Sequence, residues 1–226
     1  MIKKNILLII DFDDTLVTKN AAQLVLNNFV PDDYKEIAEK YKSKKINFRI
    51  YQEDSFKKAL EKTSVLEIEE FSKNNVEIRN GFNELINYSQ NKNIKIVILS
   101  SGLKSYINPV IDKYKSSLTI IAADMEKKPH KKVSFSYKDS YDIYCSDNWG
   151  ICKCKTVESL KDENFIIYIG DGITTDFCAS QKCDEIFALD PLYNKCLEEK
   201  INAKKFEGFN NLLKYIKTLK GKSFDT

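Results

Sequence analysis

Two acidic residues follow directly on the first apolar run of the chain, and their spacing suits hydrolytic chemistry. Asp11 and Asp13 stand two positions apart after residues 5–10, and Thr15 follows at the same spacing. Because side chains alternate along an extended segment, one carboxylate can attack while the other, pointing the same way, acts as acid or base. Such a pair also attracts a divalent cation, and its oxygen ligands suit Mg²⁺. The alternative interpretation is a capped helix N-terminus, since Asp and Thr are good caps.

Two further polar clusters end apolar runs later in the chain. Ser100, Ser101 and Gly102 offer a hydroxyl and backbone N–H groups at a predicted strand-to-helix turn, an arrangement that binds phosphate. Asp171 lies between two glycines, and Asp176 starts the next helical stretch. Each cluster has an alternative interpretation, because Ser-Gly turns are common and the Asp171 segment can be a turn followed by a helix cap.

Apolar runs alternate with helical stretches along most of the chain, which predicts an α/β protein with a mostly parallel sheet. The predicted strands are residues 5–10, 94–99, 118–122, 165–169 and 185–189. The predicted helices between and after them are residues 81–90, 104–114, 157–160, 176–182, 192–200 and 210–219. Ligands of such sheets bind at the carboxyl ends of the strands, so the polar clusters are expected to converge on one site.

Residues 19–79 interrupt this alternation and contain no convincing strand. Their predicted helices are residues 21–29, 33–44, 52–62 and 65–73. A helical block inserted after the first strand predicts a cap over the carboxyl edge of the sheet, and the alternative is a set of extra core helices. Residues 124–150, rich in Lys, Tyr and Ser, are expected to form a β-hairpin-like excursion or a long loop.

The composition argues against several classes of protein. The 226 residues include 36 Lys and Arg against 33 Asp and Glu, and a net charge of +3 with only Arg49 and Arg79 argues against a nucleic-acid module. The first apolar run is too short for a signal peptide or a membrane span, which predicts a cytoplasmic protein. The six cysteines are expected to be free thiols rather than disulfides. Cys145, Cys152 and Cys154 leave a zinc site open as an alternative, although no fourth ligand is evident.

The polar segments, in their order along the chain, resemble the motifs of the haloacid-dehalogenase superfamily of phosphohydrolases. Asp-x-Asp-x-Thr at 11–15, an apolar run ending at Ser100, a lysine, and Gly-Asp-Gly-x-x-x-Asp at 170–176 each stand where that family carries them. The resemblance implies a Rossmann-like core with a small helical cap of type 1, as in the phosphoserine-phosphatase-like branch. The implied boundaries are residues 1–18 and 80–226 for the core and residues 19–79 for the cap.

Three further segments, at residues 78–82, 145–153 and 187–196, are similar to one branch of that family. This branch comprises the methionine-salvage phosphatases, whose substrate is 2-hydroxy-3-keto-5-methylthiopentenyl 1-phosphate. The similarity implies hydrolysis of a small phosphorylated metabolite by a monomer or homodimer that binds neither nucleic acid nor membrane. The alternatives are a phosphatase for another small phosphometabolite, including a phosphoserine-like one, and a catalytically silent protein that binds phosphometabolites.

The resemblance also implies a mechanism through a covalent intermediate. Asp11 is the implied nucleophile and forms an aspartyl-phosphate, while Asp13 protonates the leaving oxygen and later activates water. The implied cofactor is Mg²⁺, held by Asp11, the backbone carbonyl of Asp13 and Asp171. Thr15 and Asp176 are implied to orient these ligands, although the five-residue step between the last two aspartates is longer than in much of this branch.

The same resemblance assigns the groups that hold the phosphoryl oxygens. Ser100 and the backbone N–H groups of Ser101 and Gly102 are implied to bind them, with Lys153 adding a positive charge. Lys155 is the alternative lysine, because Lys153 and Lys155 flank Cys154 and either could stand at the lysine position of the family's motif.

The cap is expected to decide the substrate. Lys19 and Asn20 stand where phosphoserine phosphatases carry acidic residues that meet the substrate's ammonium group, which argues against phosphoserine. Arg49 is a candidate for holding a polar or anionic end of the substrate. Its alternative interpretation is a solvated arginine on a helix face.

Overall fold

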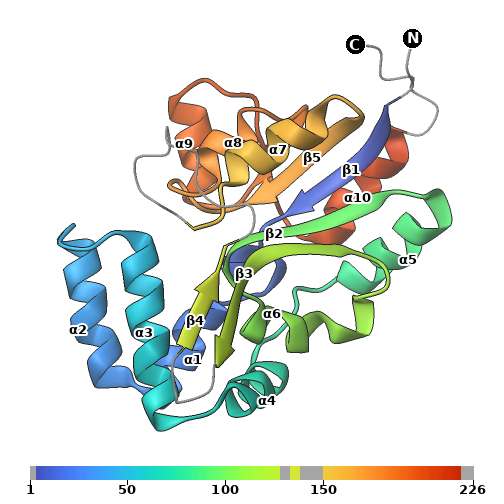
Figure 1. The fold of residues 1–226 in the computed structure, drawn as a ribbon. Helices are drawn as coiled ribbons and strands as arrows, with labels where there is room; N and C mark the ends of the chain where they lie inside the picture. Colours follow the sequence, from blue (N-terminus) through green and yellow to red (C-terminus); the bar gives the residue numbers. More distant parts are fainter. Residues whose placement is uncertain (1–3, 128–132, 138–149, 220–226) are drawn as a thin grey trace.

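The computed structural model describes residues 4–127, 133–137 and 150–219 of the chain. Its centre is a seven-stranded sheet with the order β4-β3-β2-β1-β5-β6-β7 (Figure 1). The strands are β1 Asn5–Ile10, β2 Lys95–Leu103, β3 Thr119–Lys127, β4 Val133–Ser136, β5 Asn164–Gly170, β6 Glu185–Ala188 and β7 Lys204–Lys205. Among the strands of the described residues, β3 and β4 are the only antiparallel pair. The prediction of an α/β fold with a mostly parallel sheet is confirmed.

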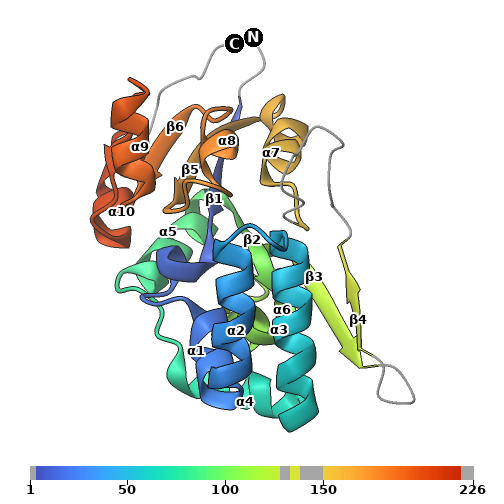
Figure 2. The ribbon, with the colours of Figure 1, turned by 90° about the vertical axis from the view of Figure 1, so that its left-hand side faces the viewer.

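Helices on both faces of the sheet bury its central strands. They are α5 Phe82–Lys92, α6 Lys104–Ile111, α7 Lys153–Lys161, α8 Phe177–Ser180, α9 Leu192–Glu198 and α10 Phe209–Thr218. Figures 1 and 2 show α5 and α10 together on one face and α7 on the opposite face. The β1 residues Leu7 to Ile10 are almost fully buried, as a continuous aliphatic run in a two-sided parallel sheet requires.

The register of the three central strands brings their carboxyl ends to one level. Ile10 of β1 pairs with Ile98 of β2 on one side and with Ile169 of β5 on the other. The residues that follow, including Asp11, Ser100 and Asp171, therefore leave the sheet at the same edge. The convergence predicted from the strand ends is a direct consequence of this register.

The insertion after β1 is helical, as predicted. It contains α1 Ala21–Phe29, α2 Pro31–Lys42, α3 Phe48–Lys62 and α4 Val65–Asn75. Side chains of Asn20, Asn47 and Ser64 cap three of these helices, and Pro31 occupies the first turn of the other. Figure 2 shows α2 and α3 side by side in front of the sheet's carboxyl edge.

The segments that enter and leave this insertion are hydrogen-bonded to each other. Val17 and Ile78 form an isolated antiparallel bridge, and the N–H of Thr18 donates to the carbonyl of Glu77 at 3.0 Å. The division into a core of residues 1–18 and 80–226 and a cap of residues 19–79 stays a prediction, and this bridge lies beside both of its boundaries.

Two strands have no clear counterpart among the predicted ones. β3 continues beyond its predicted end at residue 122 and turns back into the antiparallel β4, so the hairpin-like part of residues 124–150 is present; residues 128–132 and 138–149 lie outside the described residues. β7 is only two residues long and carries no apolar signal.

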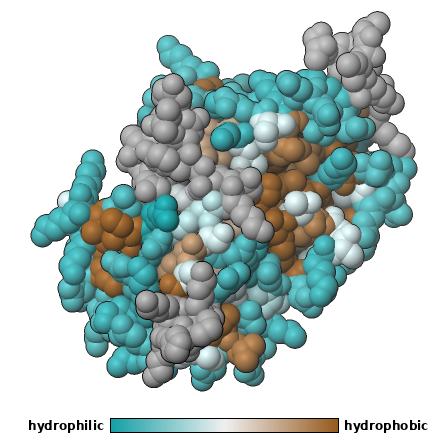
Figure 3. Space-filling view, in the orientation of Figure 1, coloured by the Kyte–Doolittle hydropathy of each residue, from teal (hydrophilic) through white to brown (hydrophobic). Residues whose placement is uncertain are grey.

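No helix in the described part of the chain is long and apolar enough to cross a membrane. On the face of the molecule that Figure 3 shows, most described side chains are hydrophilic, and apolar side chains gather near β1 and β2.

Candidate active site

The first acidic motif lies on a wide turn that directly follows β1. This turn, η1 Phe12–Leu16, closes with a hydrogen bond from the N–H of Leu16 to the carbonyl of Asp11 at 3.1 Å. Such i to i+5 turns are rare and often occur at functional sites. The guanidinium of Arg79 donates to the carbonyls of Asp14 at 2.8 Å and Thr15 at 3.0 Å. Arg79 therefore fixes the turn, a role that the sequence analysis did not assign to it.

Both oxygens of the Asp13 carboxylate accept hydrogen bonds. The N–H of Ala21, at the start of α1, donates to Oδ1 at 2.6 Å, and the Tyr106 hydroxyl donates to Oδ2 at 3.2 Å. Burial raises the pKa of Asp13 to about 6, although these hydrogen bonds act against the shift. Asp13 therefore accepts a hydrogen bond from the first turn of α1, as a capping residue does. It is also an acid whose pKa lies close to neutrality, which suits proton transfer.

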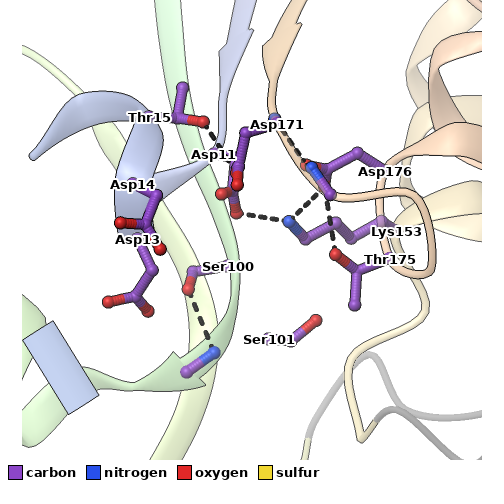
Figure 4. Close-up of polar contacts among 12 residues, drawn as sticks. Asp11, Asp13, Asp14, Thr15, Ser100, Ser101, Lys153, Asp171, Thr175 and Asp176 are labelled. Carbon is purple, nitrogen blue, oxygen red and sulfur yellow. Dashed lines mark hydrogen bonds and ion pairs between the residues drawn. The ribbon is translucent and has the colours of Figure 1, made fainter. Parts of the chain in front are cut away.

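A buried lysine joins the first and third acidic segments. Lys153 Nζ forms an ion pair with Asp11 and another with Asp176 at 2.6 Å (Figure 4). Lys155, by contrast, is exposed. Burial opposes the charge of Lys153, but the attraction of the two carboxylates outweighs it and raises the lysine's pKa. Burial is also the main cause that raises the pKa of Asp11 well above its ordinary value. Of the two candidate lysines, the structure brings Lys153 to the site.

Asp171 and Asp176 have different surroundings in the same loop. The Thr15 hydroxyl donates to Asp171 Oδ1 at 3.0 Å, and burial, followed by repulsion from Asp176, raises the pKa of Asp171 to about 6. Asp176 is fully buried and accepts from the N–H of Gly172 at 2.9 Å and from the Tyr168 hydroxyl at 2.8 Å. The many donors around Asp176 suit a residue that shapes the loop and positions Lys153.

The serine-glycine segment differs in conformation from its prediction. Ser100, Ser101 and Gly102 belong to the end of β2 rather than to a turn, and α6 begins only at Lys104. The four-residue step from Leu99 to Leu103 on β2 spans only two residues of β3, so this stretch bulges out of the regular pairing. The N–H of Gly102 donates to Ser100 Oγ at 3.0 Å, and Gln52 of α3 donates to the carbonyl of Ser101 at 2.9 Å.

Gly102 has no room for a side chain. A Cβ at this position would lie 1.8 Å from the Tyr106 hydroxyl oxygen. We expect Gly102→Ala to displace Tyr106 and to lower the free energy of unfolding by about 1–3 kcal/mol, the usual effect of overpacking. Ser101→Ala is the matched control, because the buried Ser101 hydroxyl has no hydrogen-bond partner among the described residues. Urea unfolding of both variants measures the difference, and equal stabilities would contradict this packing argument.

A cavity of about 340 Å³ lies between the sheet edge and the inserted helices. All of the predicted catalytic, phosphate-binding and metal-binding residues line it: Asp11, Asp13, Ser100, Ser101, Gly102, Lys153 and Asp171. Arg49 is not among its lining residues, since its guanidinium pairs with Glu53 at 2.9 Å and lies over the ring of Tyr137 at 4.6 Å. The sequence analysis missed the lining residues Tyr106 and Gln52, for which the linear pattern carries no signal.

The acidic residues of this site fit a divalent cation. Carboxylate oxygens of Asp11, Asp171 and Asp176 lie within 4.8 Å of one another. Lys153 supplies one positive charge against these three negative charges, and the raised pKa values of Asp11 and Asp171 reflect that imbalance together with burial. A hard cation with oxygen ligands would offset the remaining charge, and this donor set is the kind that Mg²⁺ prefers.

The cysteines near this site do not form a metal cluster among the described residues. Cys154 and Cys178 are joined in a disulfide, with Cα atoms 5.8 Å apart, whereas Cys152, Cys183 and Cys196 are free. The expectation of free thiols is therefore wrong for the first pair. The cause is the packing of α7 against α8, which brings together residues 24 positions apart. Cys145, the remaining part of the zinc alternative, lies outside the described residues.

Comparison with known proteins identifies the family. The profile of the haloacid dehalogenase-like hydrolases matches residues 8–180, which span the insertion and every acidic residue described above. The chain belongs to this family. The predicted class of enzyme, a phosphatase-type hydrolase of the haloacid dehalogenase-like family, is confirmed at this level.

Relatives of this hydrolase cover nearly its whole length. A 2-hydroxy-3-keto-5-methylthiopentenyl-1-phosphate phosphatase of Bacillus cereus is 28% identical over 213 residues, which are 93% of this chain and 95% of the relative. The phosphatase of that name from Bacillus thuringiensis subsp. konkukian is 28% identical over 211 residues, 92% of this chain and 94% of the relative. The resemblance noted in the sequence is thus matched by named proteins of similar length.

Solved structures show the same fold. A phosphoserine phosphatase holding an analogue of its phospho-aspartyl intermediate superposes with a TM-score of 0.65 at 21% identity, covering 94% of this chain and 99% of that one. At this identity the similarity concerns the fold alone. It extends over the insertion as well as the sheet, so the hydrolase shares its whole architecture with the phosphoserine-phosphatase-like structures.

Proposed function

We propose that this hydrolase cleaves a small phosphomonoester with Mg²⁺, through an aspartyl-phosphate formed on Asp11. The observation that carries the proposal is the meeting of Asp11, Asp13, Lys153 and Asp171 around one cavity at the carboxyl edge of the sheet. These residues come from three segments far apart in the sequence (Figure 4). Together they offer a nucleophile, an acid, a fixed cation and a metal ligand, the set that phosphoryl transfer through a covalent intermediate needs.

In the proposed first step, an Asp11 oxygen attacks phosphorus and the bond to the leaving oxygen breaks. Lys153 holds the Asp11 carboxylate in place and offsets negative charge on the phosphoryl group. Asp13 gives a proton to the leaving oxygen, a role supported by its pKa of about 6. In the second step Asp13 takes a proton from water, whose oxygen attacks phosphorus while the bond from phosphorus to Asp11 breaks and phosphate leaves. Ser100 and Ser101 line the cavity, and the Ser101 hydroxyl has no partner among the described residues, so their hydroxyls can meet the phosphoryl oxygens.

The proposed ligands of Mg²⁺ are the carboxylates of Asp11 and Asp171 and the backbone carbonyl of Asp13. The bound cation would supply positive charge that lessens repulsion between these carboxylates and the phosphate dianion. Thr15 keeps Asp171 oriented through its 3.0 Å hydrogen bond, and Asp176 keeps Lys153 and the N–H of Gly172 in place. Asp176 therefore belongs to the supporting residues in this proposal rather than to the ligands.

The inserted helices support a substrate with a neutral, apolar end. Their side chains on the cavity are aromatic, aliphatic or amide groups: Asn20, Ala22, Gln23, Leu26, Tyr41, Phe48, Tyr51, Gln52 and Phe56. None of these carries a charge that could meet an ammonium group. The tyrosines among them stack with ring centroids 4.8 Å apart, and such rings make favourable contacts with a thioether sulfur.

We therefore infer that the substrate is the enol-phosphate named for the Bacillus relatives, 2-hydroxy-3-keto-5-methylthiopentenyl 1-phosphate, whose methylthio tail would lie on these rings. Phosphoserine lacks such a tail and carries an ammonium group, so the cap lining disfavours it. A predicted contact from Arg49 is not part of this proposal, because its guanidinium is engaged by Glu53 and Tyr137.

The test is phosphate release from this enol-phosphate, phosphoserine and p-nitrophenyl phosphate, each with Mg²⁺ and with EDTA. We expect turnover that needs the metal and a kcat/KM for the enol-phosphate at least about tenfold above that for phosphoserine. A preference for phosphoserine would contradict the substrate and leave the chemistry standing. Folded protein that turns over none of the three esters would contradict the enzymatic proposal and favour a protein that only binds phosphometabolites.

A further inference from the structure

Tyr106 links the acid of the site to the inserted helices. Its side chain on α6 is 1% exposed, and its ring stacks on Phe56 of α3 with centroids 5.7 Å apart and an interplanar angle of 14°. A second ring, that of Phe12 on η1, lies 6.2 Å away. These two ring contacts and the burial of the side chain restrict the position of the Tyr106 hydroxyl.

That hydroxyl lies between the acid and the phosphate-binding segment. It donates to Asp13 Oδ2 at 3.2 Å, and it fills the space beside Gly102 that a side chain there would need. A phenol hydroxyl keeps its proton at neutral pH. The Tyr106 hydroxyl can therefore donate a hydrogen bond to Asp13 or accept one through its oxygen.

The contacts of Asp13 distinguish its two oxygens. Oδ1 accepts the N–H of Ala21 at 2.6 Å, and a backbone N–H cannot accept a proton in return. Oδ2 faces a hydroxyl, which can both donate and accept. When the carboxyl group is protonated, the proton therefore belongs on Oδ2, at the lone pair that the Tyr106 hydroxyl does not occupy, from which it can pass to the leaving group.

We infer that Tyr106 is a positioning residue that holds the proton-bearing oxygen of Asp13 toward the leaving group, and that Phe56 ties this arrangement to the cap. The inference rests on the proposed function. In the step concerned, the bond from phosphorus to the leaving oxygen breaks as the bond to Asp11 forms, and the proton moves from Asp13 Oδ2 to the leaving oxygen. Tyr106 loses no proton in this step.

The test uses Tyr106→Phe, which keeps the ring and removes only the hydroxyl. An alkoxide needs a proton as it leaves, whereas p-nitrophenolate leaves without one. We expect kcat/KM for glycerol 2-phosphate to fall about tenfold or more, while kcat/KM for p-nitrophenyl phosphate changes less than about threefold. Tyr114→Phe is the matched control, because Tyr114 is also buried but packs on Phe82 in the core, and it should change neither value.

A double-mutant cycle tests whether Tyr106 acts through Asp13. In an Asp13→Asn background the hydroxyl has no proton to position, so adding Tyr106→Phe should cause no further loss. Phe56→Leu, which keeps an apolar side chain but removes the stacked ring, should show the same selective loss in weaker form.

Equal losses on the two esters in Tyr106→Phe, or an undiminished loss in the Asp13→Asn background, would overturn the inference. Thermal unfolding of each variant separates these results from misfolding. Absence of turnover by the unsubstituted enzyme would instead contradict the proposed function, so the two failures are distinguishable.

Discussion

Asp11→Asn is expected to lower kcat for phosphate release by about 10⁴-fold or more, because an amide cannot form the aspartyl-phosphate. The same substitution should leave the fold as stable as before or make it more stable. Burial raises the pKa of Asp11, which means that the ionised carboxylate is disfavoured in the folded state at neutral pH. The neutral, equally sized amide removes that unfavourable charge, and Lys153 keeps its ion pair with Asp176.

Phosphate release and urea unfolding, both measured without added metal and again with Mg²⁺, test this pair of expectations. Asp32→Asn is the matched control, since Asp32 is exposed on α2 and should affect neither quantity. Residual activity above about one tenth would exclude Asp11 as the nucleophile. A large loss of stability would instead mean that the folded state depends on the Asp11 charge, contrary to the burial argument.

Lys153→Met is expected to remove both activity and stability. Lys153 is 3% exposed and pairs with two buried carboxylates, so its replacement leaves both without their cation. Breaking a buried ion pair from one side usually lowers the free energy of unfolding by about 3–5 kcal/mol. Lys155→Met is the matched control on the same helix, and its exposed side chain should contribute within about 0.5 kcal/mol.

A second substitution identifies the cause of that loss. Asp176→Asn added to Lys153→Met removes one of the uncompensated charges and should restore part of the stability, without restoring phosphate release. Urea unfolding at neutral pH measures four proteins: the unsubstituted enzyme, the two single variants and the double variant. A result against this explanation would be that Asp176→Asn lowers the free energy of unfolding of the Lys153→Met variant as much as it lowers that of the unsubstituted enzyme. In that case the two residues would not be coupled, and the ion pair would not explain the loss.

Much of this site could be predicted from the sequence because its signals are local. Apolar runs that stop at Asp11, Ser100 and Asp171 mark strand ends, and parallel strands bring such ends together whatever lies between them. The helical insertion was also predictable, since a long block without a strand signal cannot belong to the sheet. The choice between Lys153 and Lys155 needed the structure, because a two-residue step on a helix exchanges a buried face for an exposed one.

The parts that could not be predicted depend on contacts between distant segments. Tyr106 lies 93 residues from Asp13 in the sequence, and the Cys154–Cys178 disulfide follows from the packing of two helices. The extended conformation at Gly102 arises from a bulge between β2 and β3, for which a Ser-Gly sequence gives no sign. Oligomeric state and cytoplasmic location stay predictions.

The bridge between Val17 and Ile78 has a consequence for how such enzymes can diversify. Because the chain enters and leaves the insertion at paired positions outside the sheet, the insertion is joined to the rest of the protein through two adjacent peptide segments. The inserted helices could then be exchanged for others of different length, or with different side chains on the cavity, without altering the register of β1, β2 and β5. Grafting the helices between these two positions onto a related hydrolase should transfer selectivity for the leaving group while the recipient retains its own reaction centre.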